Sequence, residues 1–326
     1  MVAFGILGVG SYVPDRVLTN HDLEKMVETN DEWIRTRTGI SERRVVAPGQ
    51  ASSHLGTEAA RRALENARLE PADIDLIVAC TFTPDRPLPS TACLIQAQLD
   101  ISAGAAFDVN AACTGFVTGL AVAHGLLRNG VAKRALVIGA EAITRFVDFE
   151  DRGTCVLFGD GAGAVVLGEV EEGSGILGEF IAANGRMADA ITIYGGGSMN
   201  PPTHEMVDRR EQYMRMSGNE VFKFAVRILS EALINASERA GIEVDDLKWV
   251  IPHQANIRII EGAMKRFHIP HDRYIINLDR YGNTSAASVP LAFDEAVRDG
   301  RIQRGDLIGL VAFGAGLTWG ATIVRY

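Results

Sequence analysis

The sequence predicts an α/β fold built from two duplicated halves, and three observations support that prediction. Aliphatic runs without polar alternation recur along the chain, as is typical of strands buried on both faces of a sheet. Segments with the period of an amphipathic helix lie between these runs. The two halves also end their cores on a similar sequence pattern. The predicted strands are "DLIVAC" (75–80), "ALVIGA" (135–140), "LIGLVAF" (307–313) and "ATIVR" (321–325).

Two segments predict long helices. Residues 52–69, "SSHLGTEAARRALENARL", have a helical period, and Ser52 or Ser53 is the expected N-cap. Residues 220–241 place five apolar side chains on one helical stripe, and Gly241 is the expected C-terminal stop. The stripe consists of Val221, Phe224, Ile228, Ala232 and Ala236.

The internal repeat divides the chain near its middle. "FGDGAGAVVLG" (158–168) and "FGAGLTWGATIV" (313–324) both run from Phe-Gly through a small-residue turn into a β-branched strand. Each half also has an earlier apolar run that ends in polar residues, "IVACTFTPD" and "WVIPHQAN". We therefore expect an N-terminal half over residues 1–172 and a C-terminal half over residues 173–326. Residues 185–218 have little periodicity, and a loop of this length is expected to be a functional cover.

Composition narrows the class of protein. The chain has 326 residues, of which 47% are hydrophobic and 22% charged, as in a soluble globular protein with a substantial core. Its net charge of −9 disfavours nucleic acid or an anionic membrane as a partner, because phosphate contacts need clustered cations. No apolar run is long enough to predict a membrane span. The N-terminus lacks a basic region before its apolar residues, and Pro14 interrupts it, so we expect a strand rather than a signal peptide.

The four cysteines indicate reduced thiols. Cys80, Cys93, Cys113 and Cys155 form no CxxC pair, which argues against a zinc knuckle or a dithiol redox motif. Scattered cysteines in a chain without an export signal predict a cytoplasmic protein. Taken singly, Cys80, Cys93 and Cys155 are each expected to be a small buried hydrophobic residue.

Three polar sites nevertheless follow predicted strands or turns and precede predicted helices. They are Cys113 in "NAACTGF", His253 in "WVIPHQANIRI" and Asn283 in "DRYGNTSAASVPLAF". Ligands bind at the carboxyl ends of strands in α/β sheets, so these side chains are expected to converge. A helix N-terminus is expected to lower the pKa of the Cys113 thiol. An imidazole assists a nucleophile or donates to a carbonyl, and an Asn amide stabilises an oxyanion or enolate.

Each of these residues, and the set of three, is also compatible with a different role. Cys113 alone could fill space, His253 could cap a helix, and Asn283 could serve a turn. Papain-type proteases also order Cys, His and Asn along the chain, with roughly 130–150 residues between Cys and His. Cys113 and His253 are 140 residues apart, so their spacing does not exclude a papain-type protease. The flanking sequence argues against such a protease, because "NAACTGF" lacks the Cys-Gly-Ser-Cys-Trp context of those enzymes.

These motifs resemble the β-ketoacyl-acyl-carrier-protein synthase III family of thiolase-like condensing enzymes, which prime bacterial type II fatty-acid synthesis. The resemblance runs nearly from end to end. It rests on "DEWIRTRTGI", "AACTGF", "DRGTCVLFGDGAGAVVL", "GNEVFKFA", "PHQANIRI", "GNTSAASVP" and "FGAGLTWGATIVRY". It implies a thiolase-like five-layered αβαβα fold in a homodimer.

The resemblance also implies roles for individual residues. Cys113 matches the nucleophile that takes an acyl group from acyl-CoA. His253 and Asn283 match the pair that assists decarboxylation of malonyl-acyl-carrier protein. The backbone N–H groups of Cys113 and Ala315 match the oxyanion hole, although many relatives have glycine at the position of Ala315. No metal and no cofactor is implied, since acyl-CoA is a substrate.

Further positions match binding residues of the family. Those matching coenzyme A contacts are Trp33, Arg37, Arg152, Asn256 and Gly218. Those matching the carrier-protein docking surface are Gln254, Ala255, Asn256, Ile257, Arg258, Lys223 and Lys265, with Arg266 nearby. Leu88 and Phe158 match the acyl pocket. Leu88 stands where relatives often have Phe, so the pocket of the partner subunit is expected to admit a longer or branched primer.

The implied reaction is a decarboxylative Claisen condensation of an acyl-CoA primer with malonyl-acyl-carrier protein. It gives 3-oxoacyl-acyl-carrier protein, CoA and CO2. Two relatives remain alternatives: a polyketide starter synthase that also uses Cys, His and Asn, and a specialised acyltransferase with another donor or acceptor. A non-catalytic acyl-binding homologue is disfavoured because all three residues are present. A degradative thiolase would need a second reactive cysteine, and no cysteine follows Cys155.

Overall fold

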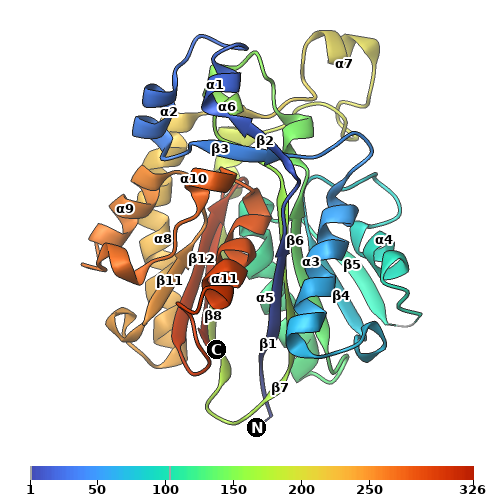
Figure 1. Ribbon diagram of the computed structural model, residues 1–326, viewed down its shortest axis with the longest axis vertical. Helices are drawn as coiled ribbons and strands as arrows, with labels where there is room; N and C mark the ends of the chain where they lie inside the picture. Colours follow the sequence, from blue (N-terminus) through green and yellow to red (C-terminus); the bar gives the residue numbers. More distant parts are fainter. Residues whose placement is uncertain (1, 103) are drawn as a thin grey trace.

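The computed structural model describes residues 2–102 and 104–326, and two sheets form its framework (Figure 1). The first has the strand order β1-β7-β6-β4-β5 and the second the order β11-β12-β13-β8. The first comprises β1 (Ala3–Tyr12), β4 (Leu76–Cys80), β5 (Ala105–Val109), β6 (Ala135–Glu141) and β7 (Gly161–Val170). The second comprises β8 (Gly175–Ala183), β11 (Trp249–Pro252), β12 (Leu307–Gly314) and β13 (Thr318–Arg325).

Helices fill the layers on and between these sheets. Helices α3 (Ser52–Ala67) and α4 (Thr91–Gln98) cover the outer face of the first sheet, and α8 (Gly218–Ala240) covers the second, with α9 (Ile257–Lys265) against α8. Helices α5 (Gly115–Arg128) and α11 (Ser288–Arg298) lie between the sheets and contact both. The order helix, sheet, helix, sheet, helix is visible in Figure 1 and confirms the predicted five-layered αβαβα fold.

The two halves have the same strand pattern. In the first, β4 is parallel to β6, and β6, β7 and β1 follow in antiparallel pairs. In the second, β11 is parallel to β12, and β12, β13 and β8 follow in antiparallel pairs. The predicted boundary at residues 172–173 falls in the turn between β7 and β8. The division of the chain into two domains at this boundary remains a prediction.

Smaller elements gather at one end of the molecule (Figure 1). They include the hairpin of β2 (Arg16–Thr19) and β3 (Glu42–Val45), and the pair β9 (Ile191–Thr192) and β10 (Arg215–Met216). The short helices are α1 (Asn20–Leu23), α2 (Asp31–Thr38), α6 (Arg152–Cys155), α7 (His204–Asp208) and α10 (Leu278–Tyr281). No helix among the described residues is both long and apolar enough to cross a bilayer.

The strand and helix predictions can be compared with these elements. All four predicted strands are present, as β4, β6, β12 and β13, and the stripe on α8 is buried. Gly241 ends α8 with φ of 72°, as expected of a left-handed C-cap. The predicted N-cap of α3 is wrong: Ala51 occupies it. The hydroxyls of Ser52 and Ser53 instead donate to Thr83 O and to Asp85 Oδ2.

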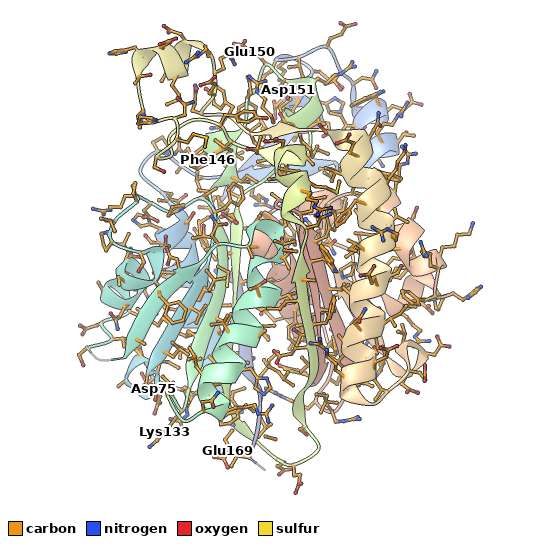
Figure 2. All side chains as sticks on the ribbon, turned by 180° about the vertical axis from the view of Figure 1, so that it is seen from behind. Asp75, Lys133, Phe146, Glu150, Asp151 and Glu169 are labelled. Carbon is orange, nitrogen blue, oxygen red and sulfur yellow. The ribbon has the colours of Figure 1, made fainter. Side chains whose placement is uncertain are left out.

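The parallel strands point toward the end that carries the small elements. Figure 2 labels Asp75 and Lys133, which precede β4 and β6, at one end of the molecule. Phe146, Glu150 and Asp151, which follow β6, lie at the other end. The carboxyl ends of β4 and β6 therefore meet the loops and short helices of the second end, where a ligand site is expected in an α/β sheet.

Candidate active site

A cavity of about 660 Å³ lies at the carboxyl ends of the strands, and Cys113, His253 and Asn283 all line it. The structure thus brings together three residues that are separated by up to 170 positions in the chain. Residues of the unpatterned segment 185–218 form part of the wall, as expected of a cover. They are Ala188, Ile191, Thr192, Ile193, Met214, Met216 and Gly218.

Cys113 lies on a 3₁₀ turn, Ala112–Thr114, between β5 and α5. Ala112 has a φ of 48°, an uncommon conformation for a residue with a side chain, so the turn that presents the thiol is sharply bent. Cys113 as a whole residue is half-buried. Burial raises its pKa to about 12, and hydrogen bonds from Ser285 and from the Cys113 backbone N–H oppose the shift. The predicted lowering of the pKa by the helix N-terminus is therefore wrong, because loss of solvent outweighs it.

His253 follows β11, and its backbone N–H donates to Val311 O at 2.8 Å. The ring is buried and meets the edge of Phe313 with centroids 5.4 Å apart. Burial lowers the pKa of His253 to about 3, so the imidazole is neutral near pH 7.

The neighbour of His253 fixes which ring nitrogen carries its proton. Nδ1 lies 2.6 Å from the Ser288 hydroxyl, which also accepts the backbone N–H of Gln254 at 3.4 Å. Among the hydrogen bonds of the described residues, that hydroxyl proton has no acceptor other than Nδ1. We therefore assign Ser288 as the donor to Nδ1, which leaves the proton on Nε2 as a donor.

Asn283 is held by backbone and side-chain contacts. Its backbone N–H donates to Leu157 O at 2.8 Å, and its carbonyl accepts the N–H of Gly159 at 3.1 Å. Its side-chain Oδ1 accepts the backbone N–H of Ser285 at 2.8 Å. The amide oxygen is thereby occupied, and the Nδ2 group is left as an uncharged donor beside the cavity.

Ala315 follows β12 and lines the cavity together with Cys113. The preceding residue, Gly314, brings β12 against the nucleophile turn: a Cβ on Gly314 would lie 2.7 Å from the Cys113 backbone nitrogen. Thr318 ties the two segments together, because its hydroxyl lies 3.1 Å from both Ala111 O and Ala315 O. The predicted oxyanion-hole residues are therefore neighbours.

The residues expected to bind coenzyme A fall into two groups, one in the cavity wall and one outside it. Asn256 and Gly218 line the cavity, whereas Trp33 and Arg152 lie beyond it, with the guanidinium 4.9 Å from the indole ring centroid. Asn256 links the cavity wall to α2, because its Nδ2 donates to the carbonyl of Arg37 at 3.0 Å. The Arg37 side chain is exposed. A cation over an indole makes a surface on which a base can stack.

The predicted carrier-protein contacts need correction at two residues, Gln254 and Ala255. Gln254 is only 1% exposed, and its amide bonds Pro252 O, Ile275 O and the N–H of Asn277. Its side chain therefore holds the loop after β11 and does not reach a docking partner. Ala255 is also buried and lines the cavity. Ile257 is half-buried, while Arg258, Lys223, Lys265 and Arg266 are exposed on α8, on α9 and at its end.

The two acyl-pocket predictions fall in different places. Phe158 is buried and lines the cavity. Leu88 is 83% exposed and does not line it within this single chain. Exposure of so large an apolar side chain agrees with a position that faces a second subunit. Both assignments remain predictions.

Three polar residues of the site were missed from the sequence. Glu141 ends β6 and is fully buried, Ser285 contacts Glu141, and Ser288 contacts His253. An acidic residue at the end of an aliphatic run, "ALVIGAE", was the available signal for Glu141. The two serines stand in the quoted block "GNTSAASVP", but only the folded chain shows what they touch.

The chain is similar to known proteins along its whole length. Family models for 3-oxoacyl-[acyl-carrier-protein] synthase III match residues 107–185, and for its C-terminal part residues 237–326. A protein of Caldanaerobacter subterraneus named β-ketoacyl-[acyl-carrier-protein] synthase III is 53% identical over 325 residues, covering 100% of this chain and 98% of the relative. A protein of the same name from Desulfitobacterium hafniense is 52% identical over 326 residues, with the same coverage.

The chain is also similar in fold to solved structures of condensing enzymes. The 3-oxoacyl-[acyl-carrier-protein] synthase III of Aquifex aeolicus has a TM-score of 0.92 at 46% identity, covering 99% of this chain and 100% of that one. The priming β-ketosynthase of the R1128 polyketide biosynthetic pathway has a TM-score of 0.91 at 34% identity, covering 99% and 96%.

Proposed function

Because the chain belongs to the β-ketoacyl-acyl-carrier-protein synthase III family, we propose that Cys113, His253 and Asn283 carry out the family's condensation within the cavity. The enzyme is an acyltransferase that joins an acyl-CoA primer to malonyl-acyl-carrier protein. The products are 3-oxoacyl-acyl-carrier protein, CoA and CO2. The observation that carries the assignment of residues is that one cavity is lined by a thiol, a neutral imidazole and an amide donor.

The first half of the reaction acylates Cys113. The sulfur attacks the thioester carbonyl of acyl-CoA, and negative charge develops on the carbonyl oxygen. The backbone N–H groups of Cys113 and Ala315 stabilise this oxyanion, and CoA leaves as a thiolate. Trp33 and Arg152 hold the adenine by stacking, and Arg37, Asn256 and Gly218 complete the path of coenzyme A to the cavity.

The second half forms the carbon–carbon bond. Malonyl-acyl-carrier protein loses CO2, and its thioester oxygen takes on enolate charge. His253 Nε2–H and Asn283 Nδ2–H donate to that oxygen, which favours the enolate without adding a charged group to a buried site. The carbanion then attacks the acyl group on Cys113 and releases the sulfur. This scheme uses no metal and no redox cofactor.

The partners follow from the same proposal. The exposed cations Lys223 and Arg258 are chain neighbours of Phe222 and Ile259, which line the cavity, and Lys265 lies further along α9. These cations would attract the acidic surface of an acyl carrier protein. We propose a homodimer in which Leu88 reaches the acyl pocket of the partner subunit. The net charge of −9 argues against nucleic-acid and anionic-membrane partners. The four scattered cysteines, which form no CxxC pair, support a protein of the cytoplasm.

One experiment tests the acyl-enzyme directly. The pure protein is incubated with acyl-CoAs from acetyl to branched and medium-chain, and the intact chain is weighed by mass spectrometry. An acyl increment that maps to Cys113 and is absent in Cys113→Ser is expected, and the fastest donor identifies the primer class. A panel that leaves Cys113 unmodified while alkylating reagents label it would refute the assignment.

Similarity to the R1128 priming β-ketosynthase supports one alternative, a polyketide starter synthase. The extender distinguishes the proposed function from a starter synthase that works without a carrier protein. Turnover with malonyl-acyl-carrier protein and not with free malonyl-CoA is expected of the proposed function, and efficient use of free malonyl-CoA would favour the alternative.

A further inference from the structure

The amide of Asn283 can support the enolate step in only one of its two orientations. Its Nδ2 group donates to a developing negative charge, whereas its Oδ1 atom would repel that charge. The two ends of an amide have nearly the same size and shape, so packing alone does not choose between them. A hydrogen bond to Oδ1 does choose, and the backbone N–H of Ser285 provides one at 2.8 Å.

Ser285 reaches Oδ1 from an unusual backbone conformation. Its φ of 51° lies in the left-handed region, which residues with a Cβ rarely adopt. The turn Ser285–Ala287 is also packed closely against β6, since a Cβ on Gly139 would lie 2.3 Å from the carbonyl oxygen of Ala286. A residue in such a conformation persists only where contacts from outside the turn hold it.

Glu141 makes a contact of this kind. The Ser285 hydroxyl donates to Glu141 Oε1 at 3.0 Å. Glu141 is fully buried at the end of β6, and its Oε2 accepts the Thr81 hydroxyl at 3.0 Å and the Thr83 backbone N–H at 3.2 Å. The Thr83 hydroxyl and the Phe82 N–H donate to the same carboxyl group. The loop that follows β4 therefore fixes the position of Oε1.

The contact with Ser285 does not depend on the charge of Glu141. A hydroxyl donates to a carboxylate and accepts from a protonated carboxyl group, so the two side chains stay together in both states. Burial raises the pKa of Glu141 to about 7, which means that both states are populated near neutral pH. Glu141 therefore acts on Ser285 through its length and its hydrogen bond rather than through its charge.

Neither Glu141 nor Ser285 lines the cavity, and the condensation described above uses neither of them. We propose that Glu141 is a positioning residue for decarboxylation: through the Ser285 hydroxyl it holds the turn whose N–H fixes the Asn283 amide, with Nδ2 toward the malonyl thioester oxygen. This inference rests on the function proposed above. Acylation of Cys113 does not use the Asn283 amide, so loss of the Glu141 contact should affect only the second half of the reaction.

The test measures the two half-reactions separately. Acylation of Cys113 by acyl-CoA is followed by mass spectrometry, and the acyl-enzyme is then mixed with malonyl-acyl-carrier protein while CO2 release is timed. In Ser285→Ala we expect CO2 release to slow about tenfold, the value of roughly one hydrogen bond, and acylation to change by less than about twofold. Glu141→Ala should show the same difference between the two rates. The matched control is Glu179→Ala, which removes a half-buried carboxylate bonded to His124 and should change neither rate.

Two further variants separate positioning from other roles. Glu141→Gln keeps the length of the side chain and can still bond the Ser285 hydroxyl, so its CO2 release should stay within about threefold of the unmodified enzyme. A rate as low as that of Glu141→Ala would mean that the charge of Glu141 is what matters. In Asn283→Ala the amide is absent, so adding Ser285→Ala should slow CO2 release no further. Effects that multiply in this double variant would mean that Ser285 does not act through Asn283. Either result would overturn the proposal.

The remaining outcomes are also decisive. A merely structural role predicts that Ser285→Ala slows both half-reactions by the same factor or slows neither, and each of these results overturns the proposal. If Glu141→Ala does not fold, Ser285→Ala decides alone, because it removes a single oxygen atom and leaves the carboxylate in place. If no acyl-CoA modifies Cys113 in the unmodified enzyme, the proposed function fails and this inference fails with it. If the unmodified enzyme is active and Ser285→Ala shows no difference between the half-reactions, only this inference fails.

Discussion

Gly314 and Cys113 are packed backbone to backbone, with the position of a Cβ on Gly314 only 2.7 Å from the Cys113 nitrogen. Real Cβ atoms do not approach backbone so closely, so Gly314→Ala must push the nucleophile turn away from β12. We expect acylation of Cys113 to slow by about 10²-fold, because small misplacements of reacting groups have effects of this size. The measurement is the single-turnover acylation rate, with circular dichroism to verify folding.

Gly125 provides the matched control for that substitution. It lies inside α5, and a Cβ there would meet nothing within 4 Å. Gly125→Ala should stabilise the enzyme by about 0.5–1 kcal/mol, since alanine is the better helix former, and should leave acylation unchanged. Equal acylation rates in both variants would show that the close contact at Gly314 does not position Cys113.

Ser288 orients His253, and its removal should affect only one half of the reaction. In Ser288→Ala the 2.6 Å contact with Nδ1 is lost, and the imidazole is free to place its proton on either nitrogen. We expect decarboxylation of malonyl-acyl-carrier protein to slow about tenfold, the value of roughly one hydrogen bond. Acylation of Cys113 should change little. A variant slowed equally in both half-reactions would contradict the assigned tautomer.

The stacked pair Trp33 and Arg152 should govern affinity for acyl-CoA. The guanidinium lies 4.9 Å from the indole centroid and donates to Glu28 O at 3.0 Å, so the cation is held over the ring. Arg152→Ala should raise the KM for acyl-CoA about threefold to tenfold with kcat nearly unchanged. Arg152→Lys should be intermediate, because an ammonium lacks the flat face of the guanidinium. A fall in kcat instead would place the pair nearer the chemistry.

Gln254 and Arg258 should respond differently despite lying four residues apart. Gln254 is buried and makes three hydrogen bonds, so Gln254→Ala should lower stability by about 1–3 kcal/mol. Arg258 is exposed above the ring of Phe222, so Arg258→Glu should raise the KM for malonyl-acyl-carrier protein in a salt-dependent manner. Unfolding in urea and steady-state kinetics at two salt concentrations separate the two effects.

The sequence predicted the sheets and the location of the site better than the chemistry of the site. The runs that became β4, β6, β12 and β13 are apolar on both faces, and this property alone places them inside a layered fold. Cys113, His253 and Asn283 could be expected to converge because each follows a strand or turn at the same end. Such arguments use local pattern and chain direction, both of which can be read along the chain.

What the sequence could not provide depends on burial and on contacts between distant segments. The pKa of Cys113 was predicted to fall and instead rises, because the loss of solvent around the thiol is invisible in local sequence. Glu141 and Ser285 are 144 residues apart, and no spacing rule pairs them. Gln254 was placed on the surface because it lies in a matching motif, yet its amide is directed inward. Each of these depends on the packed interior.

His253 and Glu141 should change the pH dependence of stability in opposite directions. The folded pKa of His253 lies near 3, below its ordinary 6.5, so the unfolded chain binds the extra proton. Its contribution to stability is present above pH 6.5 and is lost as the pH falls toward 3, by about 1.4 kcal/mol per unit. Relative to the unmodified enzyme, His253→Asn should therefore gain stability as the pH is lowered.

For Glu141 the folded pKa of about 7 lies above the ordinary 4.5, so the folded chain binds the proton and stability is lost as the pH rises through 7. As the pH falls from 7 to 4.5, the free energy of unfolding of Glu141→Gln should therefore decrease relative to that of the unmodified enzyme, by about 3 kcal/mol in total. Urea unfolding at several pH values measures both differences, and the contributions of all other groups cancel within each pair. Parallel curves for the unmodified enzyme and His253→Asn would mean that the imidazole has the same pKa in the folded and the unfolded chain, which would contradict the lowered pKa of the buried ring.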